Sequence, residues 1–141
     1  MALSNLEAKT ILVTDGYVDA RSDGVCSLIE AIEAANTNTV IDNCVAGDDL
    51  DDGGDIIGLP ANAQFVLTNV QYTVPGSDLG SGPVGLPQIT SRIDIRGNGA
   101  IILRDVNSPA FRLLHVSRTG DLTLNNLKLE NGSLLTSPQS G

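Results

Sequence analysis

Short runs of alternating apolar and polar residues recur along this chain, with tight turns between them. Residues 93–96 alternate and lead into a turn at 97–99 with the sequence Gly-Asn-Gly. The alternation returns at residues 122–124, just before a corner at Asn125-Asn126. Period-2 alternation over a few residues is typical of half-buried β-strands. We predict these strands and further short strands at residues 10–14, 56–60, 64–68, 100–103, 111–116 and 127–129.

Two of the predicted strands repeat at a fixed spacing. Ile93 and Ile95 are matched 29 residues later by Leu122 and Leu124. Short strands at a regular interval are the sequence pattern of a solenoid, in which each interval forms one coil. A β-sandwich also has short alternating strands, but it prefers hairpin turns between longer ones. The corners here suit a chain that bends rather than reverses, so the pattern predicts an all-β solenoid.

One segment has the pattern of a helix. Ser27 and Glu30 have the spacing of a capping box, and apolar residues follow at helical intervals. Asn36 stands where a left-handed residue would end the helix. We expect this helix to cap the first coil, because an open solenoid end exposes unpaired backbone groups and apolar side chains. The residues assigned to the capping helix are Ser27, Leu28, Ile29, Glu30, Ile32, Ala35 and Asn36.

Composition and charge narrow the classes of function. The 141 residues suit one domain, and the 17 acidic against 8 basic residues give a formal charge of −9. So acidic a surface repels phosphate backbones and anionic lipids, so we expect neither nucleic-acid binding nor membrane insertion. No signal-peptide pattern follows Met1. We expect residues 1–141 to be a single domain from a longer protein, with parts at 10–47, 48–88 and 89–135.

The segment around the helix resembles a known motif. Residues 26–32 (Cys-Ser-Leu-Ile-Glu-Ala-Ile), continued by 34–36, are similar to the "CSLREA" motif near the N-terminus of bacterial secreted and surface proteins, with Ile29 in place of Arg. The likeness extends in order from Thr10 to Gly132, through residues 55–60, 65–68, 85–89, 93–100 and 111–124. The resemblance implies a right-handed parallel β-helix of the pectin-lyase-like kind, secreted or at the bacterial cell surface. It implies a fold and a compartment, not a reaction.

Cys26 and Cys44 are the two cysteines of the chain. They lack the four-ligand spacing of a zinc site, and the residues alone favour free thiols and a disulfide about equally. The resemblance implies a disulfide that ties the capping helix to the loop after it.

An acidic stretch is the candidate metal site. Closely spaced carboxylates suit Ca²⁺, which prefers oxygen ligands. The spacing is not that of an EF-hand, and a solvated loop is the interpretation we favour, with no cofactor. The carboxylates concerned are Asp48, Asp49, Asp51, Asp52 and Asp55.

Catalytic chemistry has two candidate locations. His115 is the single histidine, and Ser117 lies near it without a recognisable nucleophile motif, so we favour a packed histidine. A polysaccharide lyase or glycosidase would need carboxylates, or Asp with Arg, on one outer face. The residues that could line up in this way are Asp94, Arg96, Arg104 and Asp121, and an ordinary charged face is the alternative we favour.

We therefore predict a non-catalytic structural or adhesive module, with a carbohydrate-active enzyme as the alternative. The predicted C-terminal coil has no cap, so it could pair with another chain and form homo-oligomers or filaments. A carbohydrate or a cell-surface molecule is the other class of partner we expect. Asn131-Gly132-Ser133 fits a glycosylation sequon, which we interpret as a turn. The residues expected at the open edge are Leu127, Leu129, Leu134 and Leu135.

Overall fold

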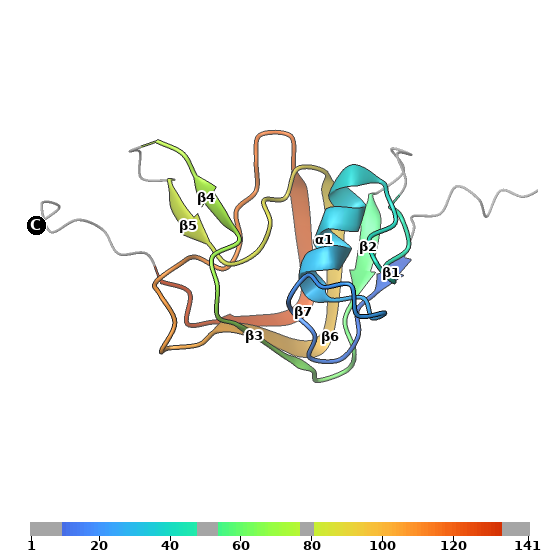
Figure 1. Cartoon of the computed structure of the whole chain (residues 1–141), viewed down its shortest axis with the longest axis horizontal. Helices are drawn as coiled ribbons and strands as arrows, with labels where there is room; N and C mark the ends of the chain where they lie inside the picture. The colour runs from blue at the N-terminus through green and yellow to red at the C-terminus, as the bar shows by residue number, and fades with distance from the viewer. Residues whose placement is uncertain (1–9, 48–53, 77–80, 134–141) are drawn as a thin grey trace, which may run out of the picture.

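The computed structural model describes residues 10–47, 54–76 and 81–133. These residues form one helix and seven strands, arranged as a bent parallel sheet and a separate two-stranded hairpin (Figure 1). The elements are β1 (Thr10–Leu12), α1 (Leu28–Thr37), β2 (Asp55–Gly58), β3 (Gln64–Leu67), β4 (Tyr72–Val74), β5 (Gly82–Val84), β6 (Arg92–Arg104) and β7 (Asp121–Glu130).

The parallel sheet has two arms because its two long strands, β6 and β7, turn a corner (Figure 1). In the first arm the order is β1-β2-β6-β7, and in the second arm it is β3-β6-β7. The corner residues Asn98 and Asn126 have left-handed backbones, with φ of 52° and 50°. Asparagine tolerates this conformation better than most residues, so the predicted Asn corners bend the strands without reversing them.

The core lies on the inner face of the bent sheet. Within each arm, apolar residues of β6 point inward at every second position, and their side chains are fully buried. Ile93 pairs with Leu122, and Ile95 pairs with Leu124, so the 29-residue repeat predicted from the sequence is confirmed as strand register. The inward residues of β6 are Ile93, Ile95, Ala100 and Ile102.

The predicted all-β fold, a right-handed parallel β-helix, is wrong. The described residues form a mixed structure with a helix in the core, an open parallel sheet and an antiparallel hairpin, and they close no solenoid. Where a third wall would be needed, the parallel contacts shrink to isolated bridges, such as Ile89 with Val116. Prolines, among them Pro83 and Pro87, remove backbone donors from this part of the chain. A continuous parallel ladder is therefore interrupted on that side.

Two segments behave differently from their predicted patterns. The sequence shows no core pattern in residues 72–87, yet β4 and β5 within this range pair as antiparallel strands, and Val84 and Leu86 are completely buried. Residues 111–116 form two isolated bridges instead of the predicted strand, although Phe111 is buried. The apolar–polar pattern of residues 111–116 therefore predicted a strand wrongly, because this segment forms only single bridges with its neighbours.

The helix α1 begins with the predicted capping box. Ser27 Oγ accepts a hydrogen bond from Glu30 N, and a Glu30 carboxylate oxygen accepts one from Ser27 N. The left-handed residue at its end is Asn38, with φ of 56°, so the predicted terminator Asn36 was wrong. Asn36 instead donates its side-chain amide to Gln88 O at 2.7 Å. The helix packs against β1 and β2, and most of its side chains are buried.

Candidate functional site

The two outer edges of the bent sheet are the candidate functional regions. We call the edge formed by β1 and β3 the closed end, because α1 and the β1–α1 loop (residues 13–27) lie against it. We call the edge formed by β7 the open end, because no described strand pairs with its outer side. Figure 1 shows the closed end toward the viewer, with α1 and the blue loop in front.

A disulfide fixes the closed end. Cys26 and Cys44 are bonded to each other with a Cα–Cα distance of 4.7 Å, and both are buried. The disulfide predicted from the resemblance is thereby confirmed. It joins the residue before the N-cap of α1 to the segment after the helix, so both ends of α1 are tied into one covalent ring.

Hydrogen bonds hold the β1–α1 loop on the first turn of α1. Tyr17 O accepts from Leu28 N at 2.9 Å, and Val18 O accepts from Ile29 N at 3.1 Å. The second carboxylate oxygen of Glu30 accepts from Arg21 N at 2.8 Å. The loop carbonyls thus satisfy helix donors that have no partner within the helix, and the loop has a defined position.

Three carboxylates approach one another at the closed end. Oxygen atoms of Asp23, Glu30 and Asp42 all lie within 4.8 Å of one another. Their oxygens already accept backbone hydrogen bonds, since Asp42 Oδ2 receives Asp23 N at 3.1 Å and Gly24 N at 3.0 Å. The close approach involves one carboxylate oxygen from each residue, which is fewer than the about 6–8 oxygen ligands that Ca²⁺ takes. We therefore regard this group as a brace for the loop and assign no ion to it.

The acidic stretch considered as a candidate calcium site lies mostly outside the described residues. Asp48, Asp49, Asp51 and Asp52 lie outside the described residues. Asp55 is in β2 and only 2% exposed, with its carboxylate against the backbone of Gly47. This carboxylate therefore does not lie on an accessible face.

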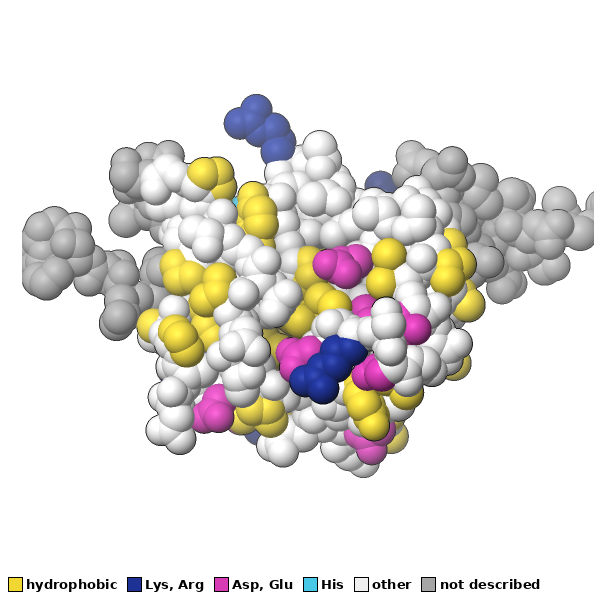
Figure 2. Space-filling model, in the orientation of Figure 1, with side chains coloured by type: hydrophobic (Ala, Val, Ile, Leu, Met, Phe, Trp, Pro, Cys, Tyr) yellow, Lys and Arg dark blue, Asp and Glu magenta, His cyan; other side chains and the backbone are white. Residues whose placement is uncertain are grey.

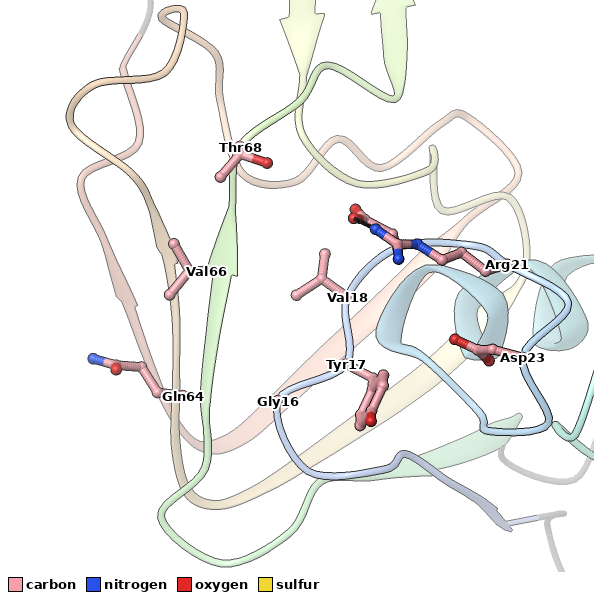
Figure 3. A pocket seen from close by; sticks show the side chains of 9 residues that line it. Gly16, Tyr17, Val18, Arg21, Asp23, Gln64, Val66 and Thr68 are labelled. Carbon is pink, nitrogen blue, oxygen red and sulfur yellow. Dashed lines mark hydrogen bonds and ion pairs between the residues drawn. The ribbon is translucent and has the colours of Figure 1, made fainter.

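A groove runs along the free side of β3 at the closed end. Its volume is about 410 Å³, which falls in the range of about 300–1,000 Å³ seen for ligand sites. Val66 on β3 and Val18 on the loop lie on opposite sides of it, and Arg21 lies near its rim (Figure 3). The lining residues are Gly16, Tyr17, Val18, Asp19, Arg21, Asp23, Gln64, Val66 and Thr68.

The face around this groove is charged. Figure 2 shows acidic side chains gathered around a basic one in the middle of the closed end, with apolar side chains further to the left. Arg21 and Asp19 form an exposed ion pair of 3.3 Å. Tyr17, which also lines the groove, is 47% exposed. The groove is thus lined by charged side chains of both signs together with Tyr17, Val18 and Val66.

The open end presents apolar side chains instead. Leu124 and Leu129 are 37% and 40% exposed, although their partners on β6, Ile95 and Ile102, are completely buried. Leu127 is half-buried and packs on the core. Leu134 and Leu135, predicted at the same edge, lie outside the described residues.

The four charged residues considered for catalysis are not brought into one group. Asp94 pairs with Arg96 at 3.3 Å and accepts from Asn125 Nδ2 at 2.8 Å. Asp121 pairs with Arg92 at 3.5 Å. Arg104 lies on the second arm, where it donates to Asn131 O at 2.7 Å and to backbone oxygens of residues 105–109. Each of these side chains therefore has a neighbour that accounts for its position.

His115 lies among side chains that pack it. Its Nδ1 is 3.1 Å from Gln88 Nε2, and its ring stacks on Tyr72 with centroids 6.4 Å apart. Ser117 Oγ is 3.0 Å from Thr119 Oγ1. The structure thus places His115 and Ser117 in separate local contacts.

The chain matches no family model, no curated protein and no solved structure. The resemblance of residues 26–36 to the CSLREA motif therefore stays a prediction. Within the described part of the chain, no helix is long and apolar enough to cross a bilayer.

Sequence reasoning missed the groove beside β3. The signal available was the pair Tyr17-Val18, two apolar residues inside an otherwise polar loop. Because their partners on β3 are about 50 residues away in the sequence, local patterns could not bring the two sides of the groove together.

Proposed function

We propose that this chain is a structural module of an exported protein, and that it builds larger assemblies by adding strands at the open end. The single observation that carries this proposal is the exposure of an apolar row on β7. That row continues a row which is fully buried one strand further in, on β6.

The inward-facing row on β7 consists of leucines, as in a core, but two of them are exposed to solvent. Leu122, Leu124, Leu127 and Leu129 stand in register with the four inward residues of β6. Covering the exposed parts of Leu124 and Leu129 would contribute about 1 kcal/mol each by the area-transfer estimate. A further strand would also satisfy the backbone groups along the outer side of β7, which otherwise form an edge prone to association.

The disulfide supports the exported part of the proposal. Disulfides persist in oxidising compartments and are rare in the cytosol of most organisms, so the Cys26–Cys44 bond is consistent with an extracellular location. The acidic composition, with a formal charge of −9, favours solubility of such a module outside the cell.

The test is the mass of the protein in solution as a function of concentration. We expect size-exclusion chromatography with light scattering to show oligomers that dissociate on dilution. Leu124→Lys and Leu129→Lys should each give a monomer, because a buried lysine at a strand interface loses its hydration. Val106→Lys is the matched control: Val106 is 68% exposed in the turn after β6 and should leave the oligomers intact. A monomeric wild-type chain at every concentration would contradict the proposal.

A further inference from the structure

The backbone of β7 offers hydrogen bonds at the open end, in the second arm of the sheet. Ile101 N on β6 donates to Ala63 O beside β3 at 2.9 Å. Backbone groups alternate in direction along a strand, so those of the next residue, Ile102, point to β7. Ile102 is paired with Leu129, and in a parallel ladder it bonds to the residues on either side of its partner. The N–H and C=O groups of Leu129 therefore point outward, where no described strand meets them.

The side chains that flank Leu129 carry opposite charges on the outer face of the sheet. Lys128 and Glu130 are exposed, and their charged atoms are 3.5 Å apart. If two copies of this arm pair antiparallel with Leu129 opposite Leu129, then Lys128 of each copy lies opposite Glu130 of the other. The neighbouring registers that keep the leucines on the inner face put Lys128 opposite Lys128, or Glu130 opposite Glu130, and directly opposed like charges are unfavourable. The remaining registers turn the leucines to the outer face.

We propose that two copies of this chain associate through their open ends, with the second arms of β7 paired antiparallel about a two-fold axis at Leu129. This inference rests on the proposed function, because it names the strand that is added at the open end. The outward N–H and C=O groups of the two Leu129 residues then bond to each other. Both copies use the same surface, so the contact is isologous and closes as a dimer.

The same two-fold axis brings the other exposed leucine of β7 to an apolar hollow. Ser133 N donates to Phe111 O at 2.8 Å, so residues 111–114 lie at the end of the second arm that is remote from the first arm. Because the paired arms run in opposite directions, the first arm of one copy, with Leu124, reaches this end of the other copy. The hollow there has a volume of about 400 Å³ and is lined by Arg112, Leu113, Leu114, Leu129, Gly132 and Ser133.

Charge reversal tests the pairing of Lys128 with Glu130. Lys128→Glu and Glu130→Lys each turn two attractive contacts of the dimer into repulsive ones, so the dissociation constant of each variant should rise on the order of tenfold. An equal mixture of the two variants should recover the wild-type constant, because the acidic pair of one copy then faces the basic pair of the other. Analytical ultracentrifugation measures these constants. Arg21→Glu is the matched control: it changes the net charge as Lys128→Glu does, but at the closed end, and should leave the dimer unchanged.

Leu129→Cys tests the position of the two-fold axis. Residues in a hydrogen-bonded antiparallel pair have Cα atoms about 5.5 Å apart, which is within the range of a disulfide. Mild oxidation should therefore give a covalent dimer on non-reducing electrophoresis. Leu127→Cys is the matched control, because the two copies of this residue would lie roughly 13 Å apart along the strands and should stay unlinked. The native disulfide of Cys26 and Cys44 is buried, which protects it from exchange.

The outcomes separate this inference from the proposed function. Suppose that the wild type forms oligomers which Leu129→Lys disrupts, while the mixed charge variants stay as weak as each variant alone. The open end then meets a different surface, and only the two-fold pairing fails. Oligomers that grow beyond the dimer, or a Leu127→Cys variant that cross-links as readily as Leu129→Cys, overturn the pairing in the same way. A wild type that is monomeric at every concentration contradicts both proposals.

Discussion

The closed end and the open end terminate the same sheet in different ways. At the closed end a disulfide, a capping box and a braced loop cover the apolar interior, and α1 residues such as Ile32 are completely buried. At the open end the equivalent interior surface ends in leucines that are 37% and 40% exposed. The helix and the braced loop therefore cover the sheet at the closed end. At the open end, the edge strand β7 has the apolar pattern of an inner strand.

This difference shows what an alternating sequence pattern can specify. The pattern determines which side chains of a strand point to the inner face of the sheet, but it does not determine whether the strand has a neighbour on one side or on both. Ile95 and Leu124 occupy the same row and have the same sequence environment, yet one is in the core and the other is at the edge. Only a further strand paired with the outer side of β7 would bury Leu124 as Ile95 is buried. Three experiments test how far the two ends differ in energy.

The largest effect is expected from a matched pair of truncations across β6 and β7. Ile95→Ala should lower the free energy of unfolding by about 2–5 kcal/mol, because it leaves a cavity in a packed core. Leu124→Ala removes a side chain that already meets solvent, so its cost should be about 1 kcal/mol or less. Urea unfolding followed by circular dichroism, in dilute solution where the chain is monomeric, measures both values.

Equal costs for the two variants would show that the monomer already covers β7, and the distinction between the ends would fail. The same measurement at a concentration that permits assembly tests the distinction between the two ends further. There the cost of Leu124→Ala should rise, while the cost of Ile95→Ala stays nearly constant.

A smaller effect is expected from opening the covalent ring at the closed end. The Cys26–Cys44 disulfide spans 18 residues, for which the chain-entropy estimate is about 3 kcal/mol. The double variant Cys26→Ala/Cys44→Ala should therefore melt on the order of 10 °C lower than the wild type in a thermal scan. Wild type treated with a reductant should show the same shift.

Amide exchange shows whether loss of the disulfide destabilises only the closed end or the whole domain. Amide exchange should accelerate in α1 and the β1–α1 loop of the double variant, and it should change little along β7. If β7 amides exchange as fast as those of α1, the two ends are not independent.

The parts predicted from sequence are those that depend on local patterns. The alternation at Ile93 and Ile95, its 29-residue repeat and the Asn corners all reflect steric preferences of a few adjacent residues. The capping box of Ser27 and Glu30 is local in the same sense. Such features could be read correctly because no distant contact opposes them.

The closure of the fold and the groove depend on contacts between distant segments. A β-helix requires three continuous parallel walls, but β4 and β5 pair with each other as antiparallel strands. The groove joins Val18 to Val66, and neither residue alone has a pattern that points to the other. The acidic group of Asp23, Glu30 and Asp42 was missed for the same reason.

The smallest effect concerns a carboxylate of α1 at the closed end. Burial raises the pKa of Glu33 above its ordinary value of 4.5, and the nearby Glu30 carboxylate adds to the rise. As the pH rises from the ordinary to the raised pKa, the unfolded chain loses its proton first, so Glu33 makes the folded state progressively less stable. Glu33→Gln should therefore stabilise the protein at neutral pH by about 0.5 kcal/mol or less, since solvent screens this side chain, and the gain should vanish below pH 4.5. Glu130→Gln at the open end is the matched control: it loses the exposed ion pair with Lys128 and should bring no gain. Urea unfolding across this pH range measures the difference, and a Glu33→Gln variant less stable than the wild type at neutral pH would show that the carboxylate braces the closed end instead of straining it.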